Sequence, residues 1–146
     1  MMIQAECGLS EWSAADYSAE VRRTDAITMV ARGSYDELFG FITGRLVGLA
    51  DVEAEIYNIG VREHLRCVGV GSALLKCFLH EARKRSARRV WLDVRESNTI
   101  GKSFYSAHGF TVAGKRKMFY STPVEDAEIM VRELGPTSRE QSGEGA

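Results

Sequence analysis

Apolar positions change their spacing twice along the middle of the chain. From Val70 to Arg85 they recur every three or four residues, which predicts an amphipathic helix. Ala54 to Val61 before it, and Val90 to Val94 after it, are short and strand-like, with Val90, Leu92 and Val94 on one side. A helix that links two strands in this way predicts a right-handed crossover between parallel strands.

Capping residues, glycines and apolar runs predict the other helices and strands. Asn98 is a candidate cap for a helix that runs to His108 and closes at Gly109, with Ile100, Phe104 and Ala107 expected to face inward. A first helix is predicted from Trp12 to Arg23. Further strands are predicted at Ala26 to Arg32, Glu37 to Leu49, Phe110 to Phe119 and Ala127 to Glu133. Residues 135–146 have nothing apolar to bury, so a disordered tail is expected.

Composition narrows the class of protein. The 146 residues fit one domain, expected at residues 1–134, with a core that needs no metal or disulfide. No apolar run approaches the ~20 residues of a membrane span, and Cys7, Cys67 and Cys77 lack metal-ligand spacing, so a cytoplasmic protein with free thiols is expected. A net charge of −1 argues against direct binding of nucleic acid. No metal site and no membrane partner are predicted.

A glycine turn stands at the start of the central helix. It reads Arg66-Cys67-Val68-Gly69-Val70-Gly71, and its two glycines let the backbone approach a ligand closely. A helix N-terminus with unpaired amides and a positive dipole end favours an anion. Neither the lysine-serine pair of a nucleoside triphosphate site nor the three-glycine dinucleotide motif is present. Taken alone, the turn fits a phosphate cradle or a tight turn that binds nothing.

Two spaced motifs make the chain resemble the GNAT superfamily of acyl-CoA-dependent N-acetyltransferases. They are Arg66-x-x-Gly69-x-Gly71 and Asn98-x-x-Gly101-x-x-Phe104-Tyr105-x-x-x-Gly109-Phe110. Residues 91–98, Trp-Leu-Asp-Val-Arg-Glu-Ser-Asn, further resemble the ribosomal-protein-alanine N-acetyltransferases, the RimI-like enzymes. The resemblance implies an α/β (α+β) fold: a mixed, mostly antiparallel sheet with a central parallel strand pair splayed around acetyl-CoA, and helices on both faces.

The N-terminus departs from the family pattern. Only eleven residues precede Trp12, so the first strand of the family is expected to be missing. The strand at Ala26 to Arg32 would then be an exposed edge, which proteins usually cover. Self-association as a homodimer, a partner strand or a misassigned start codon would each explain this departure.

The resemblance also implies roles for individual side chains. Asp93 takes the position of the general base and Tyr105 that of the general acid, at the carboxyl ends of the parallel strands. Their competing roles are an ion pair of Asp93 with Arg95 or Arg116, and a core tyrosine.

Coenzyme A contacts are implied in three places, with acetyl-CoA as co-substrate. Strand N–H groups would polarise the thioester carbonyl, the glycine turn would hold the diphosphate, and an amide would hold the pantetheine arm. The residues are Ile59, Gly60 and Val61 for the first, Arg66, Cys67, Val68, Gly69, Val70, Gly71 and Ser72 for the second, and Asn98 for the third. Simple packing is the alternative role for Gly60, and helix capping for Asn98.

Two sets of residues concern the acceptor amine. Glu55 and Glu96 are reserve bases, and Met118, Phe119 and Tyr120 are candidates for the acceptor groove. The leading hypothesis is an enzyme that acetylates the N-terminal α-amine of a protein, such as a ribosomal protein that begins with alanine. The alternatives are acetylation of a small amine (polyamine, aminoglycoside or amino acid) and a catalytically degenerate acyl-CoA-binding module.

Overall fold

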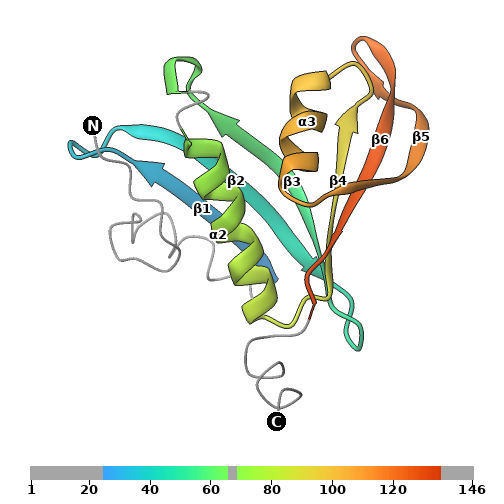
Figure 1. Ribbon diagram of the computed structural model, residues 1–146, viewed down its shortest axis with the longest axis horizontal. Coiled ribbons are helices and arrows are strands. Elements are labelled where there is room, and N and C mark those ends of the chain that lie inside the picture. The colour runs from blue at the N-terminus through green and yellow to red at the C-terminus, as the bar shows by residue number, and fades with distance from the viewer. Residues whose placement is uncertain (1–24, 66–68, 136–146) are drawn as a thin grey trace.

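Six strands form one mixed sheet in the computed structural model, which describes residues 25–65 and 69–135 (Figure 1). The spatial order of the strands is β1-β2-β3-β4-β6-β5, and every neighbouring pair is antiparallel except β3 and β4. The elements are β1 Ala26–Arg32, β2 Leu38–Val47, β3 Glu53–Val61, the short 3-10 helix Glu63–Leu65, α2 Val70–Lys84, β4 Arg89–Arg95, α3 Thr99–Ala107, β5 Thr111–Ser121 and β6 Val124–Glu133. The predicted mixed sheet with a central parallel pair is therefore confirmed.

Some sequence predictions concern segments at the two ends of the chain. The helix from Trp12 to Arg23, the question of a missing first strand and the tail beyond Gly135 lie outside the described residues. Within the described residues, β1 and β5 form the two edges of the sheet. None of the helices in those residues has the length and apolar character that a membrane crossing requires.

Helix α2 packs its apolar side against β1, β2 and β3. The buried positions are those of the predicted periodicity: Val70, Ala73, Leu74, Leu75, Cys77, Phe78, Leu79 and Ala82. Two glycines of β2 face the helix, and a Cβ atom added at Gly44 would lie 2.7 Å from the Phe78 ring. These glycines let the helix approach the sheet closely, so α2 is held by close packing along its length.

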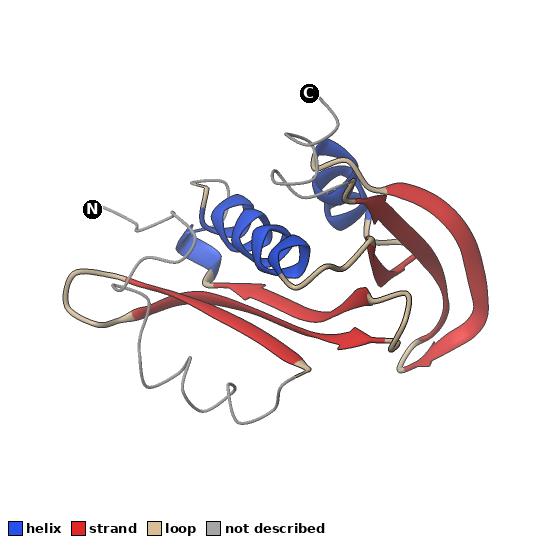
Figure 2. Cartoon of the chain, turned by 90° about the horizontal axis from the view of Figure 1, so that it is seen from below, coloured by secondary structure: helices blue, strands red, loops and turns tan. Residues whose placement is uncertain are grey.

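Both described helices lie on the same face of the sheet, as Figure 2 shows. For α3, the expected inward positions Ile100 and Ala107 are wrong, because both are exposed and Ile100 is 84% exposed. Tyr105 is buried instead and packs edge-on against Phe104 and Phe110, with ring centroids 5.3 and 5.8 Å apart. This short helix contacts the core through one narrow stripe, and that stripe lies one residue away from the predicted one.

The two parallel strands separate soon after they meet. β3 and β4 pair only at Ala54 with Val90 and at Glu55 with Trp91. Beyond this point, Tyr57 is an extra residue in β3 opposite β2, because Thr43 pairs with Asn58 but Gly44 pairs with Ile56. Such a bulge bends a strand and increases its twist. The sheet therefore opens between the carboxyl-terminal parts of β3 and β4.

Candidate active site

A cavity of about 310 Å³ occupies the opening between β3 and β4. Its walls come from both strands, from the N-cap and the last turn of α3, and from β5. The lining residues are Ile56, Tyr57, Asn58, Ile59, Leu92, Asp93, Val94, Arg95, Asn98, Tyr105 and Tyr120. Asp93 from β4, Asn98 at the N-cap of α3 and Tyr105 from α3 are thus brought together around one space.

Tyr105 is a buried phenol that lines this cavity. Burial is the main cause that raises its pKa from the ordinary value of 10.0 to about 12, and the nearby Tyr120 contributes to the same increase. A tyrosine in this state keeps its proton at neutral pH, so it can donate a hydrogen bond or a proton but does not act as a base.

Asp93 lies at the rim of the cavity in an ion pair. Its Oδ1 atom accepts a hydrogen bond from Nε of Arg116 at 3.2 Å, and the Asp93 side chain remains 30% exposed. The competing role considered for Asp93 is therefore present in the structure, with Arg116 and not Arg95 as its partner. Because the pair is partly solvated, it leaves the carboxylate accessible to water and to an incoming amine.

Tyr120 and Arg95 complete the polar wall. The Arg95 guanidinium lies over the Tyr120 ring, 4.2 Å from the centroid, and is also paired with Glu125 at 3.2 Å. Burial is the main cause that raises the pKa of Tyr120, and the charge of Asp93 adds to it. The charge of Asp93 thus acts on the Tyr120 phenol, and Tyr120 acts on Tyr105, around a single space.

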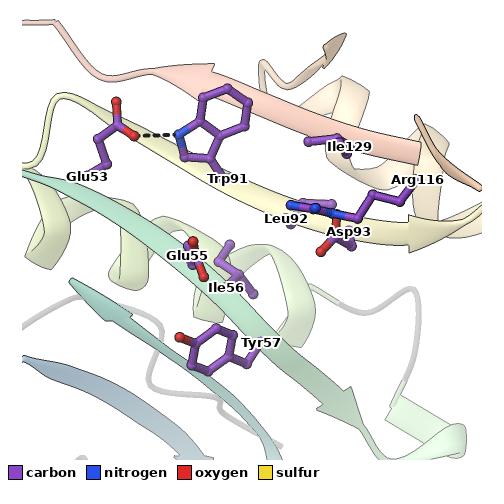
Figure 3. A pocket seen from close by; sticks show the side chains of 9 residues that line it. All are labelled: Glu53, Glu55, Ile56, Tyr57, Trp91, Leu92, Asp93, Arg116 and Ile129. Carbon is purple, nitrogen blue, oxygen red and sulfur yellow. Dashed lines mark hydrogen bonds and ion pairs between the residues drawn. The ribbon is translucent and has the colours of Figure 1, made fainter. Parts of the chain in front are cut away.

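A second cavity, of about 340 Å³, adjoins the first on the face of the sheet away from α2 (Figure 3). Glu53, Glu55, Tyr57, Trp91, Asp93 and Arg116 are among its lining residues. Glu53 is bound by Trp91 Nε1 at 2.9 Å and by Arg89 at 2.6 Å. Of the two reserve bases, Glu55 lines this cavity, whereas Glu96 is held by Lys115 at 2.6 Å and lines neither cavity.

Backbone geometry separates the three residues expected to polarise a carbonyl. The N–H of Arg62 donates to the carbonyl of Phe39, so Arg62 is a hydrogen-bonded position of the β2–β3 ladder. Hydrogen-bonded positions recur at every second residue along an antiparallel strand, which makes Gly60 the next one. The backbone polar groups of Gly60 therefore point to β2, and those of Ile59 and Val61 point to the opposite side, where β4 has separated. A Cβ atom at Gly60 would lie 2.6 Å from the Phe41 ring, so close packing accounts for this glycine.

The N-terminus of α2 has the features of an anion cradle. Gly69 has φ +96°, and a Cβ atom there would meet no atom of the described residues within 4 Å. The helix has no side-chain cap and no acidic residue in its first turn. At this end of the helix the space is open, the first backbone N–H groups have no side-chain cap, and the positive end of the helix dipole is located here. Val70, Gly71 and Ser72 form the described first turn, and Arg66, Cys67 and Val68 lie outside the described residues.

Asn98 caps α3, as predicted. Its Oδ1 accepts a hydrogen bond from Gly101 N at 2.9 Å. A Cβ atom at Gly101 would lie 2.5 Å from the Asn98 side chain, which explains a glycine at this position of the motif. Asn98 also lines the cavity between β3 and β4, so capping leaves its side chain beside the opening.

Several contacts around the site were not predicted from the sequence. Ser72 Oγ and His108 Nε2 lie 2.7 Å apart, and this contact joins the first turn of α2 to the C-terminal end of α3. Near Phe119, an irregularity between Arg116 and Tyr120 places Met118 at φ +50°, with its N–H donating to Asp126. These contacts join residues far apart in the chain, and no local pattern signals them.

Comparison with known proteins identifies the family. The model of the Acetyltransferase (GNAT) family matches residues 2–110, and the chain belongs to this family. The fold, the α2 N-terminus and the opening between β3 and β4 are the parts that the sequence motifs predicted.

Individual relatives include acetyltransferases named for different acceptors. The ribosomal protein bS18-alanine N-acetyltransferase of Escherichia coli (strain K12) is 39% identical over 80 residues, which cover 53% of this chain and 54% of that protein. The chain thus spans about half the length of the curated relatives it matches. The crystal structure of the Escherichia coli ribosomal-protein-S18-alanine N-acetyltransferase superposes with a TM-score of 0.69 at 26% identity, covering 87% of this chain and 80% of that one. Nourseothricin acetyltransferase gives 0.71 at 30% identity, covering 76% and 66%.

Proposed function

We propose that this protein transfers an acetyl group from acetyl-CoA to the N-terminal α-amine of a protein. The observation that carries the proposal is the opening between β3 and β4, where Asp93 and Tyr105 face one cavity beside the uncapped end of α2. Membership of the GNAT family supports the same chemistry.

The cofactor is proposed to lie across the open edge of β3. Its diphosphate would rest on the first turn of α2, from Gly69 to Ser72, and its acyl arm would enter the opening beside Asn98. Backbone N–H groups on the β4 side of β3, such as that of Ile59, would hydrogen-bond to the thioester carbonyl. This arrangement uses main-chain donors whose position is fixed by the β2–β3 ladder.

The transfer needs one base and one acid. The neutral amine attacks the carbonyl carbon, a C–N bond forms, and the C–S bond then breaks to release coenzyme A as a thiolate. Tyr105 would donate its proton to that sulfur, and Asp93 would accept the proton lost by the amine, directly or through a water. An α-amine has a pKa of about 8, so a modest base such as a carboxylate is adequate.

The acceptor is proposed by analogy with relatives that are named for ribosomal protein bS18-alanine. In this chain the acceptor would enter over the second cavity and the hairpin that carries Phe119 and Tyr120. Both residues lie close to the candidate site: the Arg116 guanidinium lies over the Phe119 ring, 5.7 Å from its centroid, and Tyr120 lines the first cavity.

A small cationic amine is the second candidate acceptor. The carboxylates of Glu53, Glu55 and Asp93 line the second cavity, which would attract a polycationic substrate. The likeness to nourseothricin acetyltransferase points in the same direction.

A coenzyme A release assay tests both candidates and also the degenerate-module alternative. The purified protein is mixed with acetyl-CoA and with one acceptor from a matched panel, and free thiol is measured. The panel contains a peptide that begins with alanine, the same peptide with its N-terminus already acetylated, an internal-lysine peptide, a polyamine and an aminoglycoside. Blocking the α-amine controls for acetylation at any other position of that peptide.

We expect the free alanine peptide to be the best acceptor and its blocked form to give background release. Faster release with the polyamine or the aminoglycoside would move the assignment to the small-amine function. Binding of acetyl-CoA without release above background for any acceptor would identify the chain as a binding module.

A further inference from the structure

We propose that His108 is a positioning residue for the cofactor: it donates a hydrogen bond from Nε2 to Ser72 Oγ, aims the Ser72 hydroxyl proton at the diphosphate, and strengthens binding when it becomes protonated. This inference rests on the proposed binding of acetyl-CoA at the α2 N-terminus. The observation behind it is the 2.7 Å contact between these two side chains, which come from α2 and from the C-terminal cap of α3.

The direction of this hydrogen bond decides what Ser72 can offer. A serine hydroxyl has one donor and two acceptor positions. When Nε2–H of His108 donates, Ser72 Oγ accepts, and its own proton is available to an anion above the first turn of α2. That turn has no side-chain cap, so a hydroxyl donor there adds to the backbone amides that face the anion.

One contact to the ring and one to the backbone hold His108 in place. The Phe104 ring packs against it edge-on at 4.9 Å, and Arg132 Nη1 donates to the His108 carbonyl at 2.8 Å. The fixed ring holds the Ser72 contact and limits the directions in which the hydroxyl can turn.

Among the described residues, the charged groups that act on the pKa of His108 are cationic. They are Lys76 from α2 and Arg132 from β6. Burial lowers the pKa of His108 below its ordinary value, and these two cations lower it further, so the free protein holds the imidazole neutral at neutral pH. A bound diphosphate brings negative charge to the same place and raises this pKa. Binding is then coupled to proton uptake, so affinity increases as pH falls.

Titration with dephospho-coenzyme A tests the inference. This probe keeps the diphosphate but lacks the 3′-phosphate, whose second ionisation near pH 6 would titrate in the same range. For the wild type we expect the affinity measured by calorimetry to rise roughly three- to tenfold between about pH 8 and about pH 5.5. His108→Gln keeps an N–H donor for Ser72 but does not titrate. At pH 8 the affinity of this variant for dephospho-coenzyme A is expected to lie within about twofold of the wild-type value. Its affinity should not increase as the pH falls.

The other variants separate positioning from folding. Ser72→Ala is expected to weaken binding at pH 8 by about three- to tenfold, since one hydrogen bond to an anion is lost. His80→Gln and His64→Gln alter the two other histidines, which are exposed, and should keep the wild-type pH profile.

Two outcomes would overturn the role of His108. One is a His108→Gln protein whose affinity increases as much as that of the wild type when the pH falls. The other is a wild type whose affinity does not change with pH. A wild type that binds neither dephospho-coenzyme A nor acetyl-CoA at any pH would instead contradict the proposed function, and this inference with it.

Discussion

The two halves of the sheet, on either side of the opening between β3 and β4, are built differently. The half made of β1, β2, β3 and α2 holds most of the largest fully buried side chains, among them Phe39, Phe78, Ile27 and Ile42. The half made of β4, β6, β5 and α3 is called the polar half here because it carries many ion pairs; it buries side chains such as Val90 and Met130, but none of the residues of β5 is buried. Its ion pairs include Arg89–Glu133, Arg95–Glu125, Lys102–Glu128, Lys115–Glu96 and Arg116–Asp93.

This difference suggests that the two halves of the sheet have different functional roles. Close packing resists small displacements, whereas exposed ion pairs contribute little energy and rearrange easily. The packed half holds the α2 N-terminus, where the cofactor is proposed to bind, and the polar half holds the β5–β6 hairpin, where the acceptor is proposed to enter. We therefore expect changes in the first half to affect stability and cofactor affinity, and changes in the second to affect turnover.

The largest effect is expected at Phe78, which is fully buried between α2 and the sheet. Phe78→Ala should lower the free energy of unfolding by about 3–5 kcal/mol, because it removes apolar contacts and leaves a cavity. Val112→Ala in β5 is the comparison, since Val112 is 55% exposed and should cost less than about 0.5 kcal/mol. Urea unfolding of both variants gives the two values. Equal losses would mean that the halves are equally packed.

Gly69 tests whether the packed half holds the cofactor. Gly69→Asp places a negative charge beside the α2 N-terminus and should weaken acetyl-CoA binding by at least about 100-fold. Gly69→Asn is the matched control, because it has the same shape and must adopt the same left-handed backbone but carries no charge. Calorimetry on the two folded variants isolates the charge. If both bind acetyl-CoA equally well, the diphosphate lies elsewhere.

Tyr105 reaches the opening from the polar half. Tyr105→Phe should lower kcat by roughly ten- to a thousandfold with little change in acetyl-CoA affinity, because proton donation to the thiolate matters mainly in the transition state. Since its pKa is raised to about 12, ionisation of Tyr105 should not reduce the wild-type rate below about pH 11. Tyr35→Phe, at a 92% exposed position, is the control. An unchanged kcat would leave Tyr105 a purely structural role.

The smallest effect is expected at Asp93. If it is the base, Asp93→Asn should lower kcat/KM by about tenfold, most strongly in acid, and Asp93→Glu should preserve or raise it. If Asp93 only pairs with Arg116, both variants should follow the folded fraction, with a loss of less than about 1 kcal/mol for so exposed a pair. Glu96→Gln, which breaks the Lys115 pair, is the control. The pH profile of kcat/KM and the melting temperature are measured for each.

Local patterns predicted most of the fold. The apolar periodicity placed α2 from Val70, where the structure begins it, and the capping residue Asn98 marked the start of α3. Each depends on residues within one or two turns of the chain, which is the range over which helix signals act.

Longer-range features could not be predicted in this way. The partner of Asp93 is decided by how β4, β6 and β5 align, because Asp93 pairs with Ile129 and Ile129 pairs with Gly114, close to Arg116. Because the pairing of β5 with β6 contains register shifts, the residue of β5 that lies near Asp93 cannot be found by counting along the sequence. The contact between Ser72 and His108 likewise depends on how two helices meet.

The short pairing between β3 and β4 has a consequence for hydrogen exchange. Along β3 beyond the bulge, alternate amides belong to the β2 ladder, and the intervening ones face the opening. Exchange should therefore differ between neighbouring residues, with Gly60 slow and Ile59 faster, although both lie in the same strand. Acetyl-CoA lying along this edge would slow Ile59 and leave Gly60 as it was. One strand thus contains both an internal reference for exchange and a reporter of ligand occupancy.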